Sequence, residues 1–135
     1  MATKSDNVEK AKAWFDVIWN RKQIERLDEF AGEGSIAHLE EGDFKTKDVF
    51  EAMHEHFVQT FPDVRVEIED TLADGDNVVV RWKSTATHTG HGYGLAPTQK
   101  AVTARGMTWM RFEGGKIAEG WDCWNLGGML EKLRQ

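Results

Sequence analysis

The stretch Thr46–Glu69, TKDVFEAMHEHFVQTFPDVRVEIE, contains the change of pattern that decides the fold. Up to Phe61 its apolar residues recur every three or four positions, which predicts an amphipathic helix beginning at Thr46. Pro62 ends that helix, because its ring removes a backbone donor and clashes with the preceding turn. From Val64 onward apolar and charged residues alternate, which predicts a strand with one buried face.

The chain before this stretch is also helical in pattern. Asp6 followed by Glu9 resembles a capping box at a helix start, and Gly32 and Gly34 are typical of a helix end. In order, the segments predict a helix over residues 7–20, a short helix over 24–31 and a short strand over 35–39.

The chain after this stretch predicts an antiparallel meander. The turns are Asp74–Asp76 and Gly114–Gly115, and the segment 89–100, with three glycines and one proline, is a loop. The long strands cover 78–88, 101–112 and 116–125, and a terminal helical turn covers 126–133. Helices followed by a meander favour an α+β domain over residues 1–135, with three N-terminal helices on one face of the sheet.

Composition narrows the partners and the compartment. The chain has 135 residues, 40% hydrophobic and 30% charged, with a net charge of −6 and basic residues scattered singly. We therefore expect no nucleic-acid or membrane partner. Cys123 is the single cysteine, so no intrachain disulfide forms and no zinc-type spacing exists. Met1–Lys10 lacks an apolar leader segment, which favours the cytoplasm.

The segment 88–133, HTGHGYGLAPTQKAVTARGMTWMRFEGGKIAEGWDCWNLGGMLEKL, carries an ordered set of motifs. It resembles the SnoaL-like polyketide cyclase family of the nuclear transport factor 2-like superfamily. The upstream FPDVRV (61–66) and VVRW (79–82) also fit, so the resemblance covers most of the chain. It implies a cone, in which a strongly bent sheet wraps the helices and encloses a deep apolar pocket.

Asp122 is the leading catalytic candidate. The resemblance places the family's acid/base aspartate at this position, and its neighbours Trp121, Cys123 and Trp124 are apolar. An apolar pocket raises the pKa of a carboxyl group toward the range useful for removing a proton next to a carbonyl. The alternative is that Asp122 faces solvent or pairs with an arginine.

The hairpin register decides which way Asp122 points. A three-residue loop, Glu113–Gly115, places Gly106 opposite Asp122 and leaves room there for a ligand. Thr108 then shares the face of Asp122, whereas a two-residue loop slips the pairing by one residue and inverts both faces.

The remaining site candidates are histidines and pocket-wall residues. His38 and His88 either polarise a carbonyl and orient Asp122 or are structural. His54 and His56 are expected at the surface or boundary of their helix, and Tyr93 belongs either to a lid or to a plain surface loop. The substrate-binding candidates are Trp82, Gly106, Thr108, Trp124, Met53 and Phe57, and no metal site is expected.

Three positions depart from the family pattern. Thr108 stands where some members have a histidine that helps to hold the substrate oxygen, and a threonine hydroxyl does not relay protons near neutral pH. Asn125 replaces a common aspartate, and Gln99 replaces a glycine. These departures bear on the reaction more than on the pocket.

Three functions remain open at this point. The first is a cofactor-independent cyclase or isomerase that acts on an apolar carbonyl compound with Asp122 as general base. The second is a non-catalytic domain for ligand binding or dimerisation. The third is an epoxide hydrolase using Arg105, which alternates onto the face opposite Asp122.

An exposed apolar patch predicts a homodimer. In the three-residue-loop register, the outer sheet face carries four large or sulfur-containing residues, and Arg105 and Arg111 form its polar rim. The four are Met107, Trp109, Trp121 and Cys123.

Overall fold

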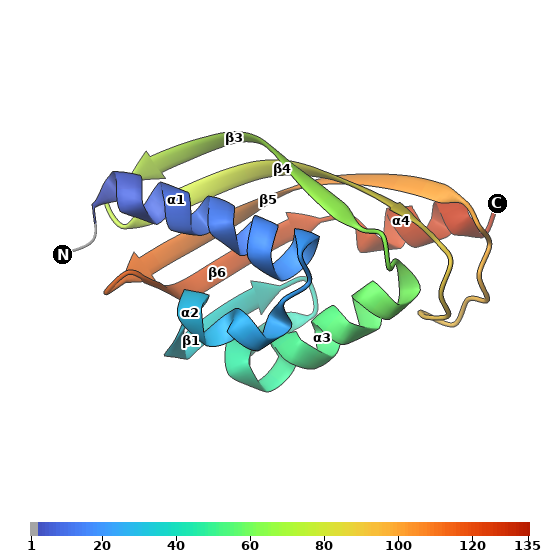
Figure 1. The fold of residues 1–135 in the computed structure, drawn as a ribbon, viewed down its shortest axis with the longest axis horizontal. Coiled ribbons are helices and arrows are strands. Elements are labelled where there is room, and N and C mark those ends of the chain that lie inside the picture. Colours follow the sequence, from blue (N-terminus) through green and yellow to red (C-terminus); the bar gives the residue numbers. More distant parts are fainter. Residues whose placement is uncertain (1–2) are drawn as a thin grey trace.

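A six-stranded sheet organises the protein, a computed structural model that describes residues 3–135. The strand order is β2-β1-β6-β5-β4-β3. The four strands β3 to β6 arch together over the helices (Figure 1). Their bounds are β1 (Ala31–Leu39), β2 (Gly42–Lys45), β3 (Arg65–Asp74), β4 (Asn77–Thr87), β5 (Ala101–Glu113) and β6 (Lys116–Trp124).

Helices cover the concave side of this sheet (Figure 1). They are α1 (Lys4–Trp14), its π-helical continuation η1 (Phe15–Asn20), the 3-10 turn η2 (Ile24–Arg26), α2 (Leu27–Phe30) and α3 (Thr46–Thr60). The terminal helix α4 (Leu126–Leu133) follows β6 and lies beside the end of β5. The capping box of α1 is formed by Thr3 and Asp6, not by Asp6 and Glu9, so the helix begins earlier than predicted. Within residues 3–135, no helix combines the length and apolarity needed to cross a membrane.

The α+β class and the bent sheet over helices confirm the predicted fold, with two corrections to the sheet. The sheet is mixed, because β1 pairs in parallel with β6. β2 was missed and pairs antiparallel with β1. Gly32 and Gly34, taken as a helix end, lie inside β1, which extends from Ala31 directly after α2.

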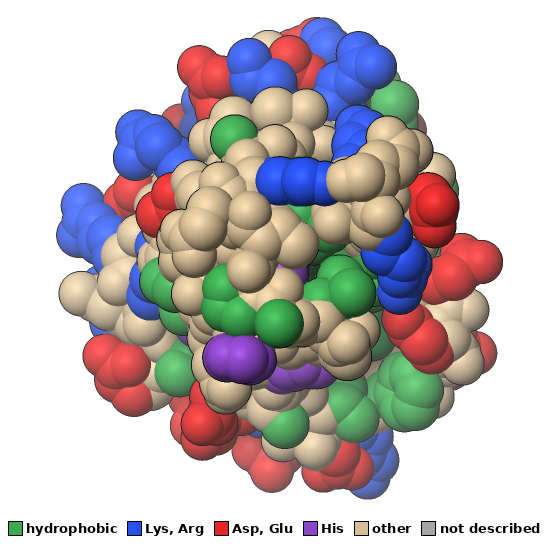
Figure 2. All heavy atoms as spheres, turned by 90° about the vertical axis from the view of Figure 1, so that its right-hand side faces the viewer, with side chains coloured by type: hydrophobic (Ala, Val, Ile, Leu, Met, Phe, Trp, Pro, Cys, Tyr) green, Lys and Arg blue, Asp and Glu red, His purple; other side chains and the backbone are tan. Residues whose placement is uncertain are grey.

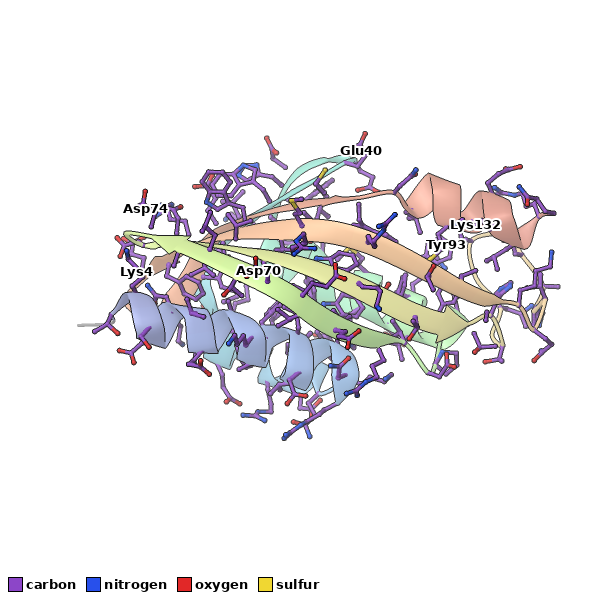
Figure 3. The ribbon with its side chains drawn as sticks, turned by 90° about the horizontal axis from the view of Figure 1, so that it is seen from above. Lys4, Glu40, Asp70, Asp74, Tyr93 and Lys132 are labelled. Carbon is purple, nitrogen blue, oxygen red and sulfur yellow. The ribbon has the colours of Figure 1, made fainter. Side chains whose placement is uncertain are left out.

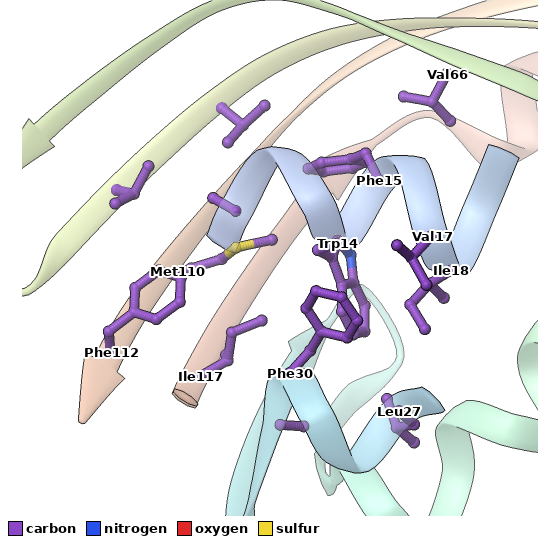
Figure 4. Close-up of a cluster of buried hydrophobic side chains, with 14 of the residues drawn as sticks. Trp14, Phe15, Val17, Ile18, Leu27, Phe30, Val66, Met110, Phe112 and Ile117 are labelled. Carbon is purple, nitrogen blue, oxygen red and sulfur yellow. The ribbon is translucent and has the colours of Figure 1, made fainter. Parts of the chain in front are cut away.

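The main core lies between α1, α2 and the concave face of the sheet (Figure 4). Trp14 and Phe15 project from the helix into this layer, and their positions follow from the apolar stripe of residues 7–20. On β4 alternate residues are buried, as the period of two requires. Each fully buried large apolar side chain contributes about 1.5–3 kcal/mol, so this layer supplies much of the stability.

The β5–β6 hairpin differs from the predicted register but keeps the predicted faces. Its loop has two residues, Gly114 and Gly115, with φ of 60° and 81°, as a tight hairpin turn requires. A two-residue loop alone would invert the faces. The pairing shifts by one residue after Phe112–Ile117, so that Ala118 is bulged and the original alternation returns.

The bulge pairs Thr108 with Asp122 and Gly106 with Trp124. The expected pairing of Gly106 with Asp122 is therefore wrong by two residues. Asp122 nevertheless shares the concave face with Thr108, while Trp109 and Trp121 occupy the convex face.

Candidate functional site

Asp122 lies near the end of β6 and is held by a short chain of hydrogen bonds. The Thr108 hydroxyl Oγ1 donates to Oδ1 of Asp122 at 2.6 Å. The indole Nε1 of Trp82 donates to the same Thr108 oxygen at 3.0 Å. Burial raises the pKa of the Asp122 carboxyl above its ordinary value, and the Thr108 hydrogen bond acts in the opposite direction with a smaller effect.

Three adjoining cavities border Asp122. The inner cavity, about 70 Å³, lies between η1 and the sheet, and its aromatic wall includes Trp19, Phe57 and Trp124. The side cavity, about 40 Å³, reaches toward β1 and Phe50 of α3. The mouth cavity, about 190 Å³, extends past Glu40. Among the described residues, neither lysine nor arginine lines any of the three, so Asp122 has no cationic partner there.

The loop 89–100 closes one side of the mouth cavity. The Tyr93 ring stacks on His56 of α3 at 4.2 Å between centroids, and the Tyr93 backbone N–H donates to His56 Nε2 at 3.3 Å. Tyr93 has a φ of 53°, a left-handed conformation that is uncommon outside glycine. Burial, and secondarily the charge of Glu41, raise the pKa of Tyr93 to about 12, so its phenol stays neutral.

The same loop is docked tightly on the end of α3. Gly90 N–H donates to the Thr60 carbonyl at 3.1 Å, and a Cβ on Gly92 would lie 1.7 Å from Thr60 Oγ1. The end of the molecule that carries this loop shows hydrophobic side chains and histidines gathered together (Figure 2). Seen from above, Tyr93 lies far from the Asp74 turn, and Glu40 belongs to the separate β1–β2 turn (Figure 3).

His38 does not lie beside Asp122, which corrects its assignment as a pocket residue. Its ring stacks on Trp121 at 4.9 Å on the convex face, and its two nitrogens contact Asp43 and Glu119, each at 2.6 Å. The two carboxylates, Asp43 first, raise the pKa of His38. The imidazole belongs to a surface ion cluster.

His88 is fully buried on the concave side but lines none of the three cavities. Its Nδ1 accepts from the Thr98 backbone N–H at 3.2 Å, and its ring packs 5.6 Å from Phe61. Its expected role beside Asp122 therefore has no support in this geometry. His54, expected at the surface or boundary of its helix, is buried instead and donates from Nε2 to the Ile18 carbonyl at 2.7 Å.

Gly106 provides packing space and not ligand space. A Cβ at Gly106 would lie 2.5 Å from Trp82 Cζ2 and 2.7 Å from Trp124 Cβ. The Trp82 indole and the Trp124 side chain thus occupy the room that was expected for a substrate. Arg105 borders a separate hollow with Asn125 and does not reach the cavities at Asp122, so the epoxide hydrolase hypothesis loses its arginine.

Most expected pocket-wall residues line these cavities, and several wall residues were missed. Trp82, Trp124, Thr108, Phe57 and Met53 all line at least one of them. The missed ones include Trp14, Phe15, Trp19 and Ser84. The aromatic residues were visible as a helical stripe, but the same stripe is typical of a plain core.

Metal ligation has no geometric support in the described part of the chain, where no group of three or more His, Cys, Asp or Glu side chains is arranged to hold an ion.

The fold and the half-buried Asp122 define a class of small cone-shaped domains with a polar group beside an aromatic cavity. The chain belongs to the SnoaL-like polyketide cyclase family, whose family model matches residues 9–133. No curated protein sequence gives a significant match to the chain.

Solved structures share the fold. AclR from Streptomyces galilaeus, a proposed hydroxylase, is 25% identical, with a TM-score of 0.88 over 98% of this chain and 83% of that chain. A SnoaL-like polyketide cyclase from Jannaschia sp. CCS1 is 20% identical, with a TM-score of 0.88 over 98% and 94%. IdmH from Streptomyces antibioticus, a proposed polyketide cyclase, is 20% identical, with a TM-score of 0.83 over 96% and 99%.

Proposed function

We propose that this protein is an enzyme that acts on a small, uncharged, largely apolar carbonyl compound, with Asp122 as general base. The observation that carries the proposal is the Asp122 carboxyl, enclosed at the junction of three cavities with Thr108 as its hydrogen-bond donor. Family membership supports chemistry of the polyketide cyclase type. The acidic residues and the absence of Lys and Arg along the described cavity walls disfavour an anionic substrate.

The proposed step is a proton transfer followed by bond formation. Asp122 takes a proton from the carbon next to a carbonyl, and the C–H electron pair forms an enolate. The enolate carbon attacks a second carbonyl of the same molecule, so that a C–C bond forms and that carbonyl becomes an alkoxide. Asp122 returns its proton to the alkoxide, which leaves atoms and charge balanced without an added cofactor. An isomerisation would share the first step and return the proton to a different carbon.

The enolate oxygen needs hydrogen-bond donors other than His38 and His88, since neither lines the three cavities at Asp122. Ser84 lines the inner cavity and has no side-chain hydrogen bond among residues 3–135. Trp14, Trp19 and Trp124 line the same cavity. We assign the substrate oxygen to this donor set, because a charge that develops in a water-poor cavity is stabilised strongly by fixed dipoles.

Deuterium exchange tests the base directly, without knowledge of the final product. The protein is incubated in D₂O with a panel of aromatic ketones and 1,3-diketones, and loss of the α-proton signal is followed by NMR. We expect catalysed exchange with at least one ketone, and a fall of about 10²–10⁴-fold in Asp122→Asn. Ser84→Ala should keep exchange but slow it. Equal exchange in wild type and Asp122→Asn would refute the mechanism.

A non-catalytic ligand-binding domain is the alternative. It shares the cavities but requires no base, so it predicts ligand-induced thermal stabilisation of the wild type with no exchange for any bound ketone. A ligand that stabilises wild type and Asp122→Asn equally, and is never exchanged, would favour this alternative.

We further propose a two-fold homodimer formed through the convex sheet face. A row of side chains crosses this face from β3 to β1 by cross-strand pairing, with Trp109 49% and Trp121 38% exposed. The row is Leu72, Val79, Trp109, Trp121 and His38, and Met107 and Cys123 lie beside it, also exposed. Apart from His38, which stacks on Trp121 within its ion cluster, the row is apolar, and an exposed apolar surface of this extent is unusual on a monomer.

Sedimentation tests the dimer. The wild type should sediment as a dimer at micromolar concentration, and Trp109→Glu should give a folded monomer. Trp121→Glu should also give a folded monomer, so the test still holds if Trp109→Glu fails to fold. A monomeric wild type would refute the proposal.

A further inference from the structure

The hydrogen bonds of Trp82 and Thr108 have a fixed direction. An indole N–H only donates, so the Thr108 oxygen must accept the bond from Trp82. Thr108 is buried, and Asp122 Oδ1 is the single acceptor within reach of its hydroxyl among the described residues. The hydroxyl hydrogen must therefore go to Oδ1, since any other direction leaves a buried donor unpaired.

The two oxygens of Asp122 are consequently unequal. If Oδ1 carried a proton, that proton and the Thr108 hydroxyl hydrogen would both lie between two oxygens only 2.6 Å apart, and they would repel each other. Oδ2 has no hydrogen-bond partner in the described part of the chain and is not among the solvent-inaccessible unpaired atoms, so it remains reachable from the cavities.

We propose that Trp82 and Thr108 are positioning residues that hold Oδ1 as an acceptor in both protonation states of Asp122, so that Oδ2 alone takes and returns the substrate proton. This inference rests on the proposed function of Asp122 as general base. Trp82 acts through Thr108, and Thr108 acts through Asp122. The arrangement confines the reacting C–H bond to the side of the carboxyl that faces the cavity.

The Trp82–Thr108 pair differs from the histidine that the resemblance implies at the position of Thr108 in some family members. A histidine can exchange protons near neutral pH, whereas Thr108 can only orient. The wall residue Trp82 removes the one freedom that a threonine hydroxyl has, which is rotation about its C–O bond. The two residues together give a fixed donor without a titrating group.

Vibrational spectroscopy of the protonated Asp122 carboxyl tests the positioning by Trp82 and Thr108 independently of turnover. At low pH, the C=O stretch of Asp122 is identified as the infrared band that Asp122→Asn abolishes. In wild type and Thr108→Ser that carbonyl oxygen accepts a hydrogen bond. In Thr108→Val it does not, so we expect its band to move to higher wavenumber. Trp82→Phe should split the band, because the Thr108 oxygen no longer accepts from the indole and can then accept from a proton carried on Oδ1.

Deuterium exchange supplies the second measurement. Thr108→Val should slow exchange by about 10²-fold through misplacement of the base, and Thr108→Ser by less than about 3-fold. A band that stays in place in Thr108→Val refutes the proposed positioning by Trp82 and Thr108, whatever the exchange rate. A shifted band without deuterium exchange in any variant supports the positioning and refutes the proposed function instead.

Discussion

Replacing Gly106 by alanine should destabilise the protein and loosen Asp122, the proposed base, through Trp82. The new Cβ would lie 2.5 Å from Trp82 Cζ2, 2.7 Å from Trp124 Cβ and 2.9 Å from the Cys123 carbonyl oxygen. All three distances are below ordinary van der Waals contact, and none of the three neighbours is the free end of a flexible chain. Overpacking of this kind costs about 1–3 kcal/mol.

Thermal and urea denaturation measure that cost. For 135 residues, the entropy of unfolding is about 0.28 kcal/mol per kelvin, so the melting temperature should fall by about 4–10 °C. Gly34→Ala is the matched control: Gly34 is also in a strand, but its Cβ would meet nothing within 4 Å. If Gly106→Ala and Gly34→Ala both have the melting temperature of the wild type, Trp82 and Trp124 do not pack against Gly106 as described.

Three further results are expected. Asp122→Asn should raise the melting temperature at pH 7, because burial raises the pKa of the Asp122 carboxyl in the folded state. Such a group stabilises the fold below its ordinary pKa and loses that contribution as pH rises through the folded-state pKa. The gain in stability of Asp122→Asn over the wild type should therefore vanish by about pH 3, and at pH 7 it should equal about 1.4 kcal/mol per unit of measured pKa shift. Burial lowers the pKa of His54, so the wild type should lose stability as pH falls through about 6.5, and this part of the loss should disappear in His54→Gln when melting is compared at pH 8 and pH 5. Gly92→Ala should displace the loop from Thr60, and faster limited proteolysis within residues 89–100 would report it, whereas an unchanged cleavage rate would contradict the tight docking.

The order of elements was predictable because it depends on local patterns. The change of period at Pro62 separates helices from strands, and each long strand has its own alternation and turn. The parallel pairing of β1 with β6 has no such local signature, since it joins segments far apart in the chain. Gly32 and Gly34 even favoured a helix end over the strand that contains them.

The site was predictable to the extent that it depends on alternation along one strand. Asp122 and Thr108 were placed on one face correctly, although the bulge at Ala118 that makes this possible leaves no mark in the sequence. His38 shows the opposite case. Alternation put it on the face of Ile36, but alternation does not say whether that face is concave or convex.

The pairing of β1 with β6 has a consequence for how the protein is made. A ribosome that has released the chain only up to Lys100 has delivered all three N-terminal helices and β1, but neither β5 nor β6. The first helix can then pack on β3 and β4 but lacks its core partners on β5 and β6, and β1 has no strand on the side where Gly120 will lie. Because chains are synthesised N-terminus first, these apolar and strand-edge surfaces stay exposed until β5 and β6 have been made. Slow translation near the C-terminus should therefore favour aggregation of this chain, and a chaperone that shields helices of the nascent chain should relieve it.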